Sequence, residues 1–342
     1  ENFSAELLRE RVDKIVDEDI PLLRHRISTT EAIRKDLGLD KPKYIQLAGY
    51  FNDMSIISLH NNSDNDNFFY LDDDKYAPYL TLLRGANRSL IIKYPYMKRS
   101  YQTQRPVSEM IAQAFPKTFV IAIISMAFAV IIGIFLGITS AIYKNTLIDK
   151  SILVSSVFGM SLPSFFFAIL ISYLFAYLLG DITGLNMTGN LTEIDDFGNG
   201  ERVVLKNMVL PVITLSIRPL AVLTELSRAS MLDVLSTDYI VTAKAKGLPQ
   251  KTVLMRHALK NSLNPIITSS TGWLASLLAG TVFVELVFDW KGMGTLIVDA
   301  LDKYDLPVLM GCIFFISVIL IILNIISDIL YAKIDPRVKL NE

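Results

Sequence analysis

The chain has 342 residues, of which 51% are hydrophobic and 20% are charged, and its formal net charge is -1 at pH 7. Its mean hydropathy is +0.41, so the composition is typical of a membrane protein, and there is no overall basic field that would favour nucleic acid as a partner. Cys312 is the single cysteine, which excludes a disulfide within the chain and a cysteine zinc cluster.

The first 116 residues contain no apolar run long enough to cross a bilayer, so we expect residues 1–116 to be water-soluble. The run at 29–40, TTEAIRKDLGLD, is typical of a capped helix that ends near its glycine. Residues 55–100 contain short strand-like runs separated by polar turns, which predicts a small α+β unit. The acidic triplet at 72–74 lacks the spacing of an EF-hand, which favours a solvated turn over a calcium site.

Five apolar segments follow, and we expect each to cross the membrane: residues 118–143, 151–180, 208–226, 262–284 and 306–330. The third contains Arg218 and Glu225, so neighbouring helices must shelter its polar face. In the second, Pro163 predicts a kink, because proline leaves backbone carbonyls free for Ser161 or for a ligand. In the fourth, small residues spaced four apart favour close helix contact: Gly272, Ser276 and Gly280, with Ala275 and Ala279.

The loop charges predict the orientation of these spans. Lysine and arginine gather in the turn 143–151, in the loop 228–260 and in the C-terminal tail, whereas the connections 180–202 and 289–305 are acidic and rich in glycine. Because cytoplasmic loops carry the excess of Lys and Arg, the first group is expected in the cytoplasm. Alternation then puts residues 1–116 outside, and we expect one further span before Glu1, which would make six.

The loop 228–261 has the strongest local signals. Ser236, Thr237 or Asp238 can cap a helix of about three turns that ends at Gly247, and Pro249 prevents its continuation. A second helix is expected from 249 to 261, with its basic residues largely off its apolar face.

One side of the first helix is thin in the sense that it carries only small residues, Ala243, Ala245 and Gly247, so another backbone can approach it closely. Tyr239 offers a large aromatic anchor for a partner. A solvated basic loop that only sets topology is the alternative interpretation.

The same residues also carry a family resemblance. The runs DYIVTAKAKGL and VLMRHALKNSLNPII resemble the cytoplasmic loop of ABC-importer permeases, specifically the B-type subunit of the oligopeptide and dipeptide family. The general importer pattern has Glu-Ala-Ala-x3-Gly-x9-Ile-x-Leu-Pro. Gly247 matches it, while Val241, Thr242 and Ala243 stand at the first three positions, and His257 and Lys260 replace the Ile and Pro.

Further matches extend the resemblance to residues 28–54 and from 105 to the C-terminus. The segment VELVFDWKGMGTL and the terminal SDILYAKIDPRVKL resemble family signatures, with matching positions at Glu285, Asp289, Gly292, Gly294, Asp328, Asp335, Pro336 and Arg337. We expect structural roles for these residues.

The resemblance implies an all-α polytopic membrane protein of the ABC-importer permease fold, with an extracytoplasmic α+β region, in the bacterial inner membrane. It implies an extracytoplasmic region 1–116 with an insert at 55–100, a transmembrane domain 117–335 with the loop 228–261, and a cytoplasmic tail 336–342. The residues expected to couple this subunit to an ATPase are Ser236, Asp238, Tyr239, Thr242, Ala243, Ala245, Lys246 and Gly247. The implied partners are a second permease, two ATPase subunits that bind ATP and Mg, an extracytoplasmic solute-binding protein and the lipid bilayer.

The function expected from the resemblance is transport of peptides or a similar small solute, without an enzyme site in this chain. The sequence contains neither a phosphate-binding loop of the form G-x-x-x-x-G-K-[ST] nor an H-E-x-x-H motif, and its three histidines cannot form a metal cluster in the membrane. Residues expected to line the translocation path are Ser161, Pro163, Arg218 and Glu225, although Arg218 and Glu225 fit a structural role equally well.

Two other classes of protein compete with this interpretation. In an ion-coupled secondary transporter, Arg218, Glu225 and Asp328 would relay protons, but such folds tend to show inverted repeats, and the sequence has no convincing repeat. An extracytoplasmic sensor would need a cytoplasmic output domain, which the sequence does not contain. The solute itself cannot be named, because importers of nickel, sugars and antibiotic peptides share this permease pattern.

Overall fold

The computed structural model describes residues 41–62, 69–194 and 200–334, and it divides the chain into two compact units, residues 1–97 (unit 1) and 98–342 (unit 2). The division lies before the boundary expected at 116. The helix expected at 29–40 and the matching positions Asp335, Pro336 and Arg337 lie outside the described residues.

Unit 1 combines two helices with a small antiparallel sheet. Helix α3 (Lys43–Met54) precedes β1 (Ile57–Asn61), and α4 (Asp73–Tyr76) precedes β2 (Tyr79–Arg84) and β3 (Arg88–Lys93). The strand order is β1-β3-β2, and a bulge between Thr81 and Leu83 shifts the register of β2 on β3. Strands and helices therefore do form within the segment 55–100.

In this sheet polar side chains dominate the buried face and aliphatic side chains dominate the exposed face, which reverses the usual arrangement. The buried positions on β1 and β3 are Ile91 and the polar residues Ser58, His60, Ser89 and Lys93, whereas the exposed positions include five aliphatic side chains: Ile57, Leu59, Leu80, Leu82 and Leu83. In the register, Ile92 pairs with Ile57 and Leu80, and Leu90 pairs with Leu59 and Leu83, so these six aliphatic side chains share one face. Within the described part of unit 1, this face is an exposed apolar patch of the kind that interacts with other surfaces.

The buried face is held together by a polar cluster. The Tyr76 hydroxyl donates to Asp53 Oδ1 at 2.5 Å, and the Lys75 Nζ donates to the Tyr76 hydroxyl at 2.6 Å. Lys93 donates to the Asp53 carbonyl and lies 4.8 Å from the centre of the Tyr76 ring. Burial lowers the pKa of Lys93 to about 8, since it removes the charged amine from water.

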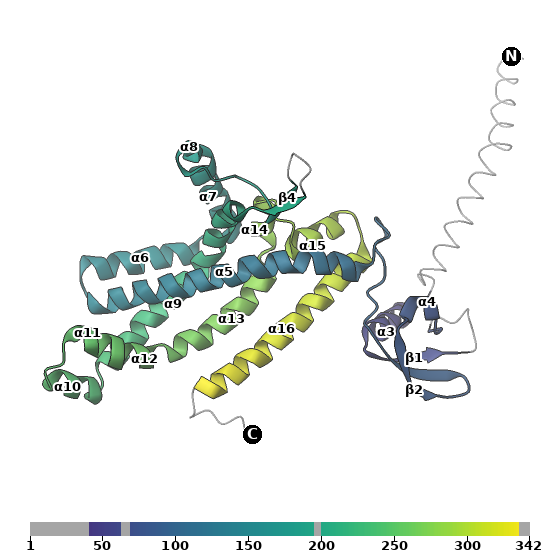
Figure 1. Cartoon of the computed structure of the whole chain (residues 1–342), viewed down its shortest axis with the longest axis horizontal. Coiled ribbons are helices and arrows are strands. Elements are labelled where there is room, and N and C mark those ends of the chain that lie inside the picture. The colour runs from purple at the N-terminus through teal and green to yellow at the C-terminus, as the bar shows by residue number, and fades with distance from the viewer. Residues whose placement is uncertain (1–40, 63–68, 195–199, 335–342) are drawn as a thin grey trace, which may run out of the picture. The chain divides into compact units, whose positions relative to one another are not determined.

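Unit 2 is a bundle of long helices (Figure 1). Its membrane-facing framework consists of α5 (Val107–Ile142), α6 (Leu147–Ser161), α7 (Ser164–Ile171), the π-helix η2 (Ser172–Leu178), α9 (Val209–Leu235), α13 (Asn264–Gly280) and α16 (Leu306–Ile334). Shorter elements connect them: α8 (Gly180–Thr183), β4 (Thr192–Ile194), β5 (Glu201–Val203), the 3-10 helix η3 (Leu205–Met208), α14 (Val282–Val287) and α15 (Met293–Asp302).

Length and composition single out 3 described helices that can cross a membrane, at Val107–Ile142, Leu205–Leu235 and Leu306–Ile329, or up to 4 if a bent pair counts as one span. That pair is α6 with the segment Ser164–Leu178, and it is bent by 109°. The kink expected at Pro163 is confirmed, and it is sharp enough for a broken span or a re-entrant loop. Helix α13 has 17 residues, which is short of the roughly 20 that a bilayer needs.

Two spans also differ in extent from the expectation. Helix α5 begins at Val107 and continues through Pro116, and α9 continues to Leu235, past Arg228. The added turns of α5 are amphipathic rather than apolar, so hydropathy alone does not find them. On α9, charged residues alternate with apolar ones, and the helix continues because Leu223 and Met231 are fully buried.

Helices α5 and α9 cross with their backbones close together. A Cβ atom at Gly137 would lie 2.4 Å from the Ser227 Cβ and 2.6 Å from the Thr224 carbonyl oxygen, and one at Gly133 would lie 3.0 Å from the Leu223 Cβ. Only glycine permits this approach. The main hydrophobic core extends from it, through Ile121, Leu223 and Trp290.

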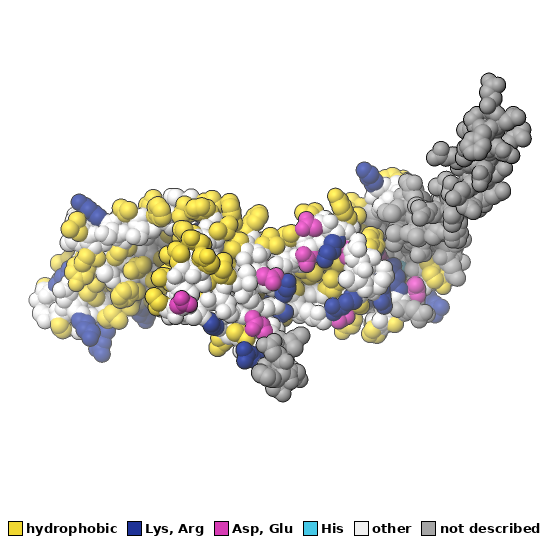
Figure 2. Space-filling view, turned by 90° about the horizontal axis from the view of Figure 1, so that it is seen from above, with side chains coloured by type: hydrophobic (Ala, Val, Ile, Leu, Met, Phe, Trp, Pro, Cys, Tyr) yellow, Lys and Arg dark blue, Asp and Glu magenta, His cyan; other side chains and the backbone are white. Residues whose placement is uncertain are grey.

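The two ends of unit 2 are different. The turn between α5 and α6 lies at the same end as α10–α12, and α14 and α15 lie at the opposite end (Figure 1). At the α10–α12 end the surface shows Lys and Arg side chains without acidic ones beside them, whereas farther along the molecule Lys and Arg lie among Asp and Glu (Figure 2). Hydrophobic side chains cover much of the surface along the helices (Figure 2).

We predict that unit 1 becomes more stable as the pH rises from 8 towards 10.5. Lys93 has a pKa of about 8 when folded and an ordinary value of 10.5, so between these values the unfolded state binds more protons, and stability increases with pH by ~1 kcal/mol per pH unit. Hydrogen exchange of the β1–β3 amides in the full chain, corrected for intrinsic rates, measures this gain. Lys93→Met should abolish it, and an equal gain in that variant would contradict the assignment to Lys93.

Candidate functional site

The loop after α9 forms two helical arms. Helix α10 (Asp238–Ala245) is followed by α11 (Gln250–Thr252), the π-helix η4 (Val253–Ala258) and α12 (Leu259–Ser262). Gly247 lies between the arms in the left-handed region, with a φ of 75°. The turn expected at Gly247 is confirmed.

The start and length of α10 differ from the expectation. Thr237 is the N-cap residue, but its hydroxyl donates to the Val234 carbonyl and the Ser236 hydroxyl donates to the Asp233 carbonyl, so no side chain caps α10. These hydroxyls bond backward because α9 ends directly before them, where its last carbonyls lack the usual amide partner four residues on. Helix α10 has 8 residues, which is about two turns rather than three.

The second arm is helical over the expected range but is not a regular α-helix. Residues Val253–Ala258 form π-helical hydrogen bonds, and such segments are frequent at functional sites. Val253 and Ala258 are buried, and Lys251, Arg256 and Lys260 are exposed, as expected.

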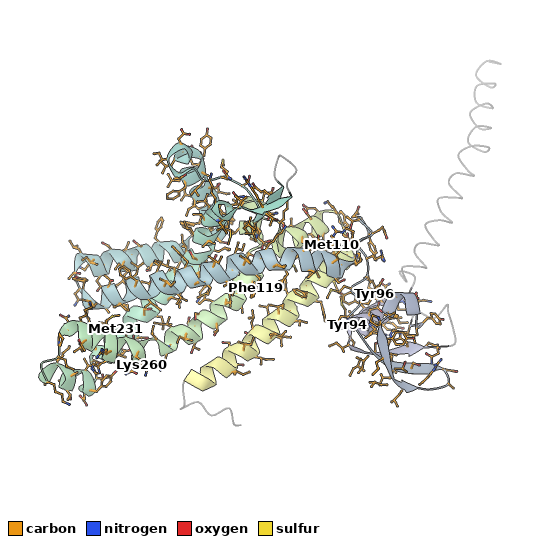
Figure 3. All side chains as sticks on the ribbon, in the orientation of Figure 1. Tyr94, Tyr96, Met110, Phe119, Met231 and Lys260 are labelled. Carbon is orange, nitrogen blue, oxygen red and sulfur yellow. The ribbon has the colours of Figure 1, made fainter. Side chains whose placement is uncertain are left out.

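The arms are attached to the bundle by a small core of their own. Ile240 and Ala243 of α10 pack with Met231 of α9, Ala141 of α5 and Val253. Ile240 and Met231 are completely buried. Figure 3 shows Met231 and Lys260 at this end of unit 2. A force on α10 is therefore transmitted directly to the ends of α5 and α9.

The outward surface of α10 carries most of the residues expected to couple to an ATPase. Ser236, Asp238, Tyr239, Thr242, Ala245, Lys246 and Gly247 are exposed. Ala243 is different, since it is only 7% exposed and faces the inner core. The thin outer side therefore consists of Ala245 and Gly247, because Ala243 lies on the same face as Ile240, three positions before it.

Tyr239 also braces the two arms. Its hydroxyl accepts a hydrogen bond of 2.8 Å from the Asn261 Nδ2, and the ring remains 42% exposed. The side chain thus positions α10 on α12 while offering an aromatic surface to a partner.

None of the four residues expected to line the translocation path takes part in an ion pair within the described part of the chain. Arg218 is exposed and Glu225 half-buried on α9, and neither forms a salt bridge with a residue that the structure describes. Ser161 and Pro163 are exposed at the bend after α6, where the Ser161 hydroxyl donates to the Val157 carbonyl at 2.7 Å. Their contribution to a translocation path stays a prediction.

A pocket of about 360 Å³ opens between α5, α6, α7 and α9. Its lining includes Ser151, Ser155 and Gly159 of α6 and Ile217 and Leu220 of α9. It reaches none of the four expected path residues. Helix α6 still contacts α9 beside this pocket, because a Cβ at Gly159 would lie 3.0 Å from the Ile217 Cγ2.

Two ionic sites were missed by the sequence analysis. Arg228 forms a bidentate pair with Asp149, with Nε–Oδ1 and Nη2–Oδ2 distances of 2.7 and 2.8 Å. Arg228 counted only as one of the loop's positive charges, and Asp149 was overlooked. The signal was an acidic residue in an otherwise basic turn.

Glu285 forms the second site, at the opposite end. It is completely buried, and its carboxylate accepts hydrogen bonds from Thr118 and Thr281 and from the amides of Gly294 and Thr295. A Cβ at Gly292 would lie 2.5 Å from the Glu285 Oε2. Glu285, Gly292 and Gly294 therefore form one unit that joins α5, α14 and α15.

The small residues expected on the fourth span are partly exposed. Gly272 and Ser276 of α13 are exposed, and a Cβ at Gly272 would meet no atom within 4 Å. Ala275 is buried instead, since it faces the other side of α13.

Comparison with known proteins identifies the chain's relatives. Residues 129–340 match the family described as "Binding-protein-dependent transport system inner membrane component". The "Dipeptide transport system permease protein DppB" of Bacillus subtilis (strain 168) is 34% identical over 275 residues, which are 80% of this chain and 83% of that protein. The "Oligopeptide transport system permease protein AppB" of the same organism is 33% identical and covers 79% of this chain and 82% of its own length.

A solved structure supports the fold. The structure titled "Inward facing conformations of the MetNI methionine ABC transporter: CY5 native crystal form" has a TM-score of 0.51 and 13% identity, and it covers 67% of this chain and 97% of that chain. The chain therefore belongs to the family of binding-protein-dependent transport system inner membrane components, as a permease subunit of an ABC importer of the oligopeptide and dipeptide type.

Proposed function

We propose that this permease subunit forms half of a translocation path for peptides or a similar small solute, and that α10 docks on a cytoplasmic ATPase subunit. The proposed solute class rests on the names of the relatives, two of which are a dipeptide and an oligopeptide transport permease. The arrangement of α10 carries the coupling role. One face of α10 packs on α5 and α9, and the other is exposed with a thin side and an aromatic anchor.

The proposed complex contains a second permease, two ATPase subunits and an extracytoplasmic solute-binding protein. The exposed side of α13 at Gly272 and Ser276 suits close contact with the second permease, because small residues let helix backbones approach in a membrane. ATP and Mg would bind to the ATPase subunits. Closure of the two ATPases would move α10 and, through its core with α5 and α9, rock the helices between inward-open and outward-open states.

The orientation is part of the proposal. The turn between α5 and α6 and the arms α10–α12 lie at one end of unit 2 (Figure 1), and both carry basic residues. This end would face the cytoplasm by the positive-inside rule. Unit 2 starts at residue 98, and its first long helix, α5, ends at the basic end with Ile142. The start of α5 would therefore lie on the opposite side of the membrane, and residues 1–97, which precede it, would be extracytoplasmic.

Cysteine labelling tests this orientation. A cysteine at Asn62 should react with a membrane-impermeant maleimide in intact spheroplasts, because it would lie outside. A cysteine at Gln250, exposed on the second arm, should react only after permeabilisation. Buried Cys312 gives a low background. The opposite labelling pattern would reverse the orientation and remove the coupling role.

The energy source gives a second test. Transport by the reconstituted complex should stop when the ATPase subunits are inactivated by substitution of their catalytic residues, because this chain supplies no phosphate-binding loop. A proton gradient without ATP should support no uptake. Uptake driven by the gradient alone would favour the secondary transporter instead.

Substitutions on α10 test the docking surface. Ala245→Asp adds a charge to the exposed thin side that docking would have to desolvate without a partner. Gly247→Val forces a β-branched residue to a φ of 75°, which costs about 1–2 kcal/mol. Both variants should insert and pair with the second permease, but should lose at least tenfold in solute-stimulated ATP hydrolysis or in recovery of the ATPase subunits.

Gln250→Asp is the matched control, since it adds the same charge on the exposed second arm. It should keep most of the stimulated activity. Wild-type transport by both α10 variants would contradict a coupling role for this helix.

A further inference from the structure

We propose that the Asp149–Arg228 pair is the element that makes α6 move with α9 when α10 is displaced. Both residues are then positioning residues for the coupling between ATPase and translocation path. This inference rests on the proposed function of α10.

The geometry of the pair fixes α6 at its first turn. Arg228 donates two parallel hydrogen bonds to the two carboxylate oxygens of Asp149, at 2.7 and 2.8 Å. The Ser140 hydroxyl and the Asn145 amide donate to the same carboxylate. The side chains are 3% exposed for Asp149 and 21% for Arg228. A bidentate, shielded pair of this kind restricts both distance and angle.

The carboxylate joins three helices. Ser140 belongs to the last turn of α5, Asp149 to the first turn of α6, and Arg228 to the last third of α9. No other side-chain hydrogen bond joins α6 to α9 among residues 147–161 and 209–235, all of which the structure describes. Beyond the pair, α6 and α9 meet through apolar contacts, such as Gly159 against Ile217, beside a pocket of about 360 Å³. The pair is therefore the principal polar bond through which α9 can pull α6.

The path from α10 to the pair is rigid. Met231 of α9 and Ile240 of α10 are both completely buried in one core. At the level of the pair, a Cβ at Gly137 would lie 2.9 Å from the Arg228 backbone nitrogen, so α5 and α9 are in backbone contact there. Displacement of α10 therefore carries this part of α9 with it.

The other end of α6 is the place where such a displacement has an effect. Helix α6 ends at Ser161, and the chain bends by 109° before Ser164 begins the next segment. A bend at a proline has few backbone hydrogen bonds to resist a change in angle. Movement of α6 by the pair would change the angle at this bend within the membrane.

Stability alone does not account for the pair. A buried ion pair pays a desolvation cost that can exceed its Coulomb energy, and apolar replacements are often as stable. The best supported role of buried ionic groups is to fix the relative position of two structural elements. Apolar contacts beside an open pocket restrict sliding less than a bidentate ion pair does, so the relative position of α6 and α9 depends mainly on this pair.

The test compares Asp149→Asn, Arg228→Gln and the double variant in the reconstituted complex with its ATPase subunits. Each single variant should lose at least tenfold in solute-stimulated ATP hydrolysis and in transport, and the double variant should lose no more than either single one. Glu109→Gln is the control, because it removes an exposed pair with Arg105 of 2.6 Å. It should keep wild-type stimulation.

A distance measurement separates positioning from folding. Spin labels on exposed Lys150 of α6 and Phe166 of α7, in a Cys312→Ala background, should report a distance change on ATP binding in the wild type. The change should shrink by at least half in Asp149→Asn. If that variant fails to assemble, Arg228→Lys keeps the charge but loses the fork, and should reduce stimulation about threefold while the complex assembles.

The outcomes distinguish the two proposals. Failure of the wild-type chain to recover ATPase subunits would overturn the proposed function. With a coupled wild type, the inference about the pair is overturned by wild-type stimulation in the single variants, by losses that multiply in the double variant, or by an unchanged ATP-dependent distance.

Discussion

The backbone contact between α5 and α9 is the constraint on which unit 2 depends. At Gly137 the two helices leave no room for a Cβ, and at Gly133 they leave very little. In a membrane, helices gain little from burying apolar side chains, because lipid is equally apolar, so close packing must supply the association. The small residues of GIFLG on α5 provide it. This contact brings Arg228 to the level of Ser140 and Asp149, and it aligns the ends of α5 and α9 as the base on which α10 packs.

Helix α10 shows why a short helix can be both anchored and available. With only 8 residues, it could not be stable alone. Ile240 and Ala243 secure it to the core of α5 and α9, and the hydrogen bond between Tyr239 and Asn261 holds it to the second arm. Its remaining surface is free for contacts outside the chain. A coupling element needs both properties, because an unanchored helix would be displaced without moving the bundle.

Much of this arrangement follows from the sequence. The left-handed turn at Gly247, the bend at Pro163 and the exposed Lys251, Arg256 and Lys260 were predicted, because glycine, proline and helical periodicity act locally. The inward position of Ala243 was missed, since small residues suit a buried face as well as a docking face. The Asp149–Arg228 pair was missed because 79 positions separate its members. The reversed faces of the sheet in unit 1 depend on the register and bulge of β2, which strand propensity does not specify.

Two buried carboxylates hold opposite ends of α5, and their partners differ in a way that bears on movement. Near the start of α5, Glu285 accepts from two hydroxyls, one of them that of Thr118 on α5, and from two backbone amides, so short groups fix α5 to α14 and α15. Near the last turn of α5, Asp149 is held mainly by the long side chain of Arg228. An arginine fork keeps its geometry while its flexible stem lets the two helices shift together. Under the proposed function, the part of α5 held by Glu285 would therefore be the pivot, and the end where α6, α9 and α10 meet would be the part of the bundle that rocks.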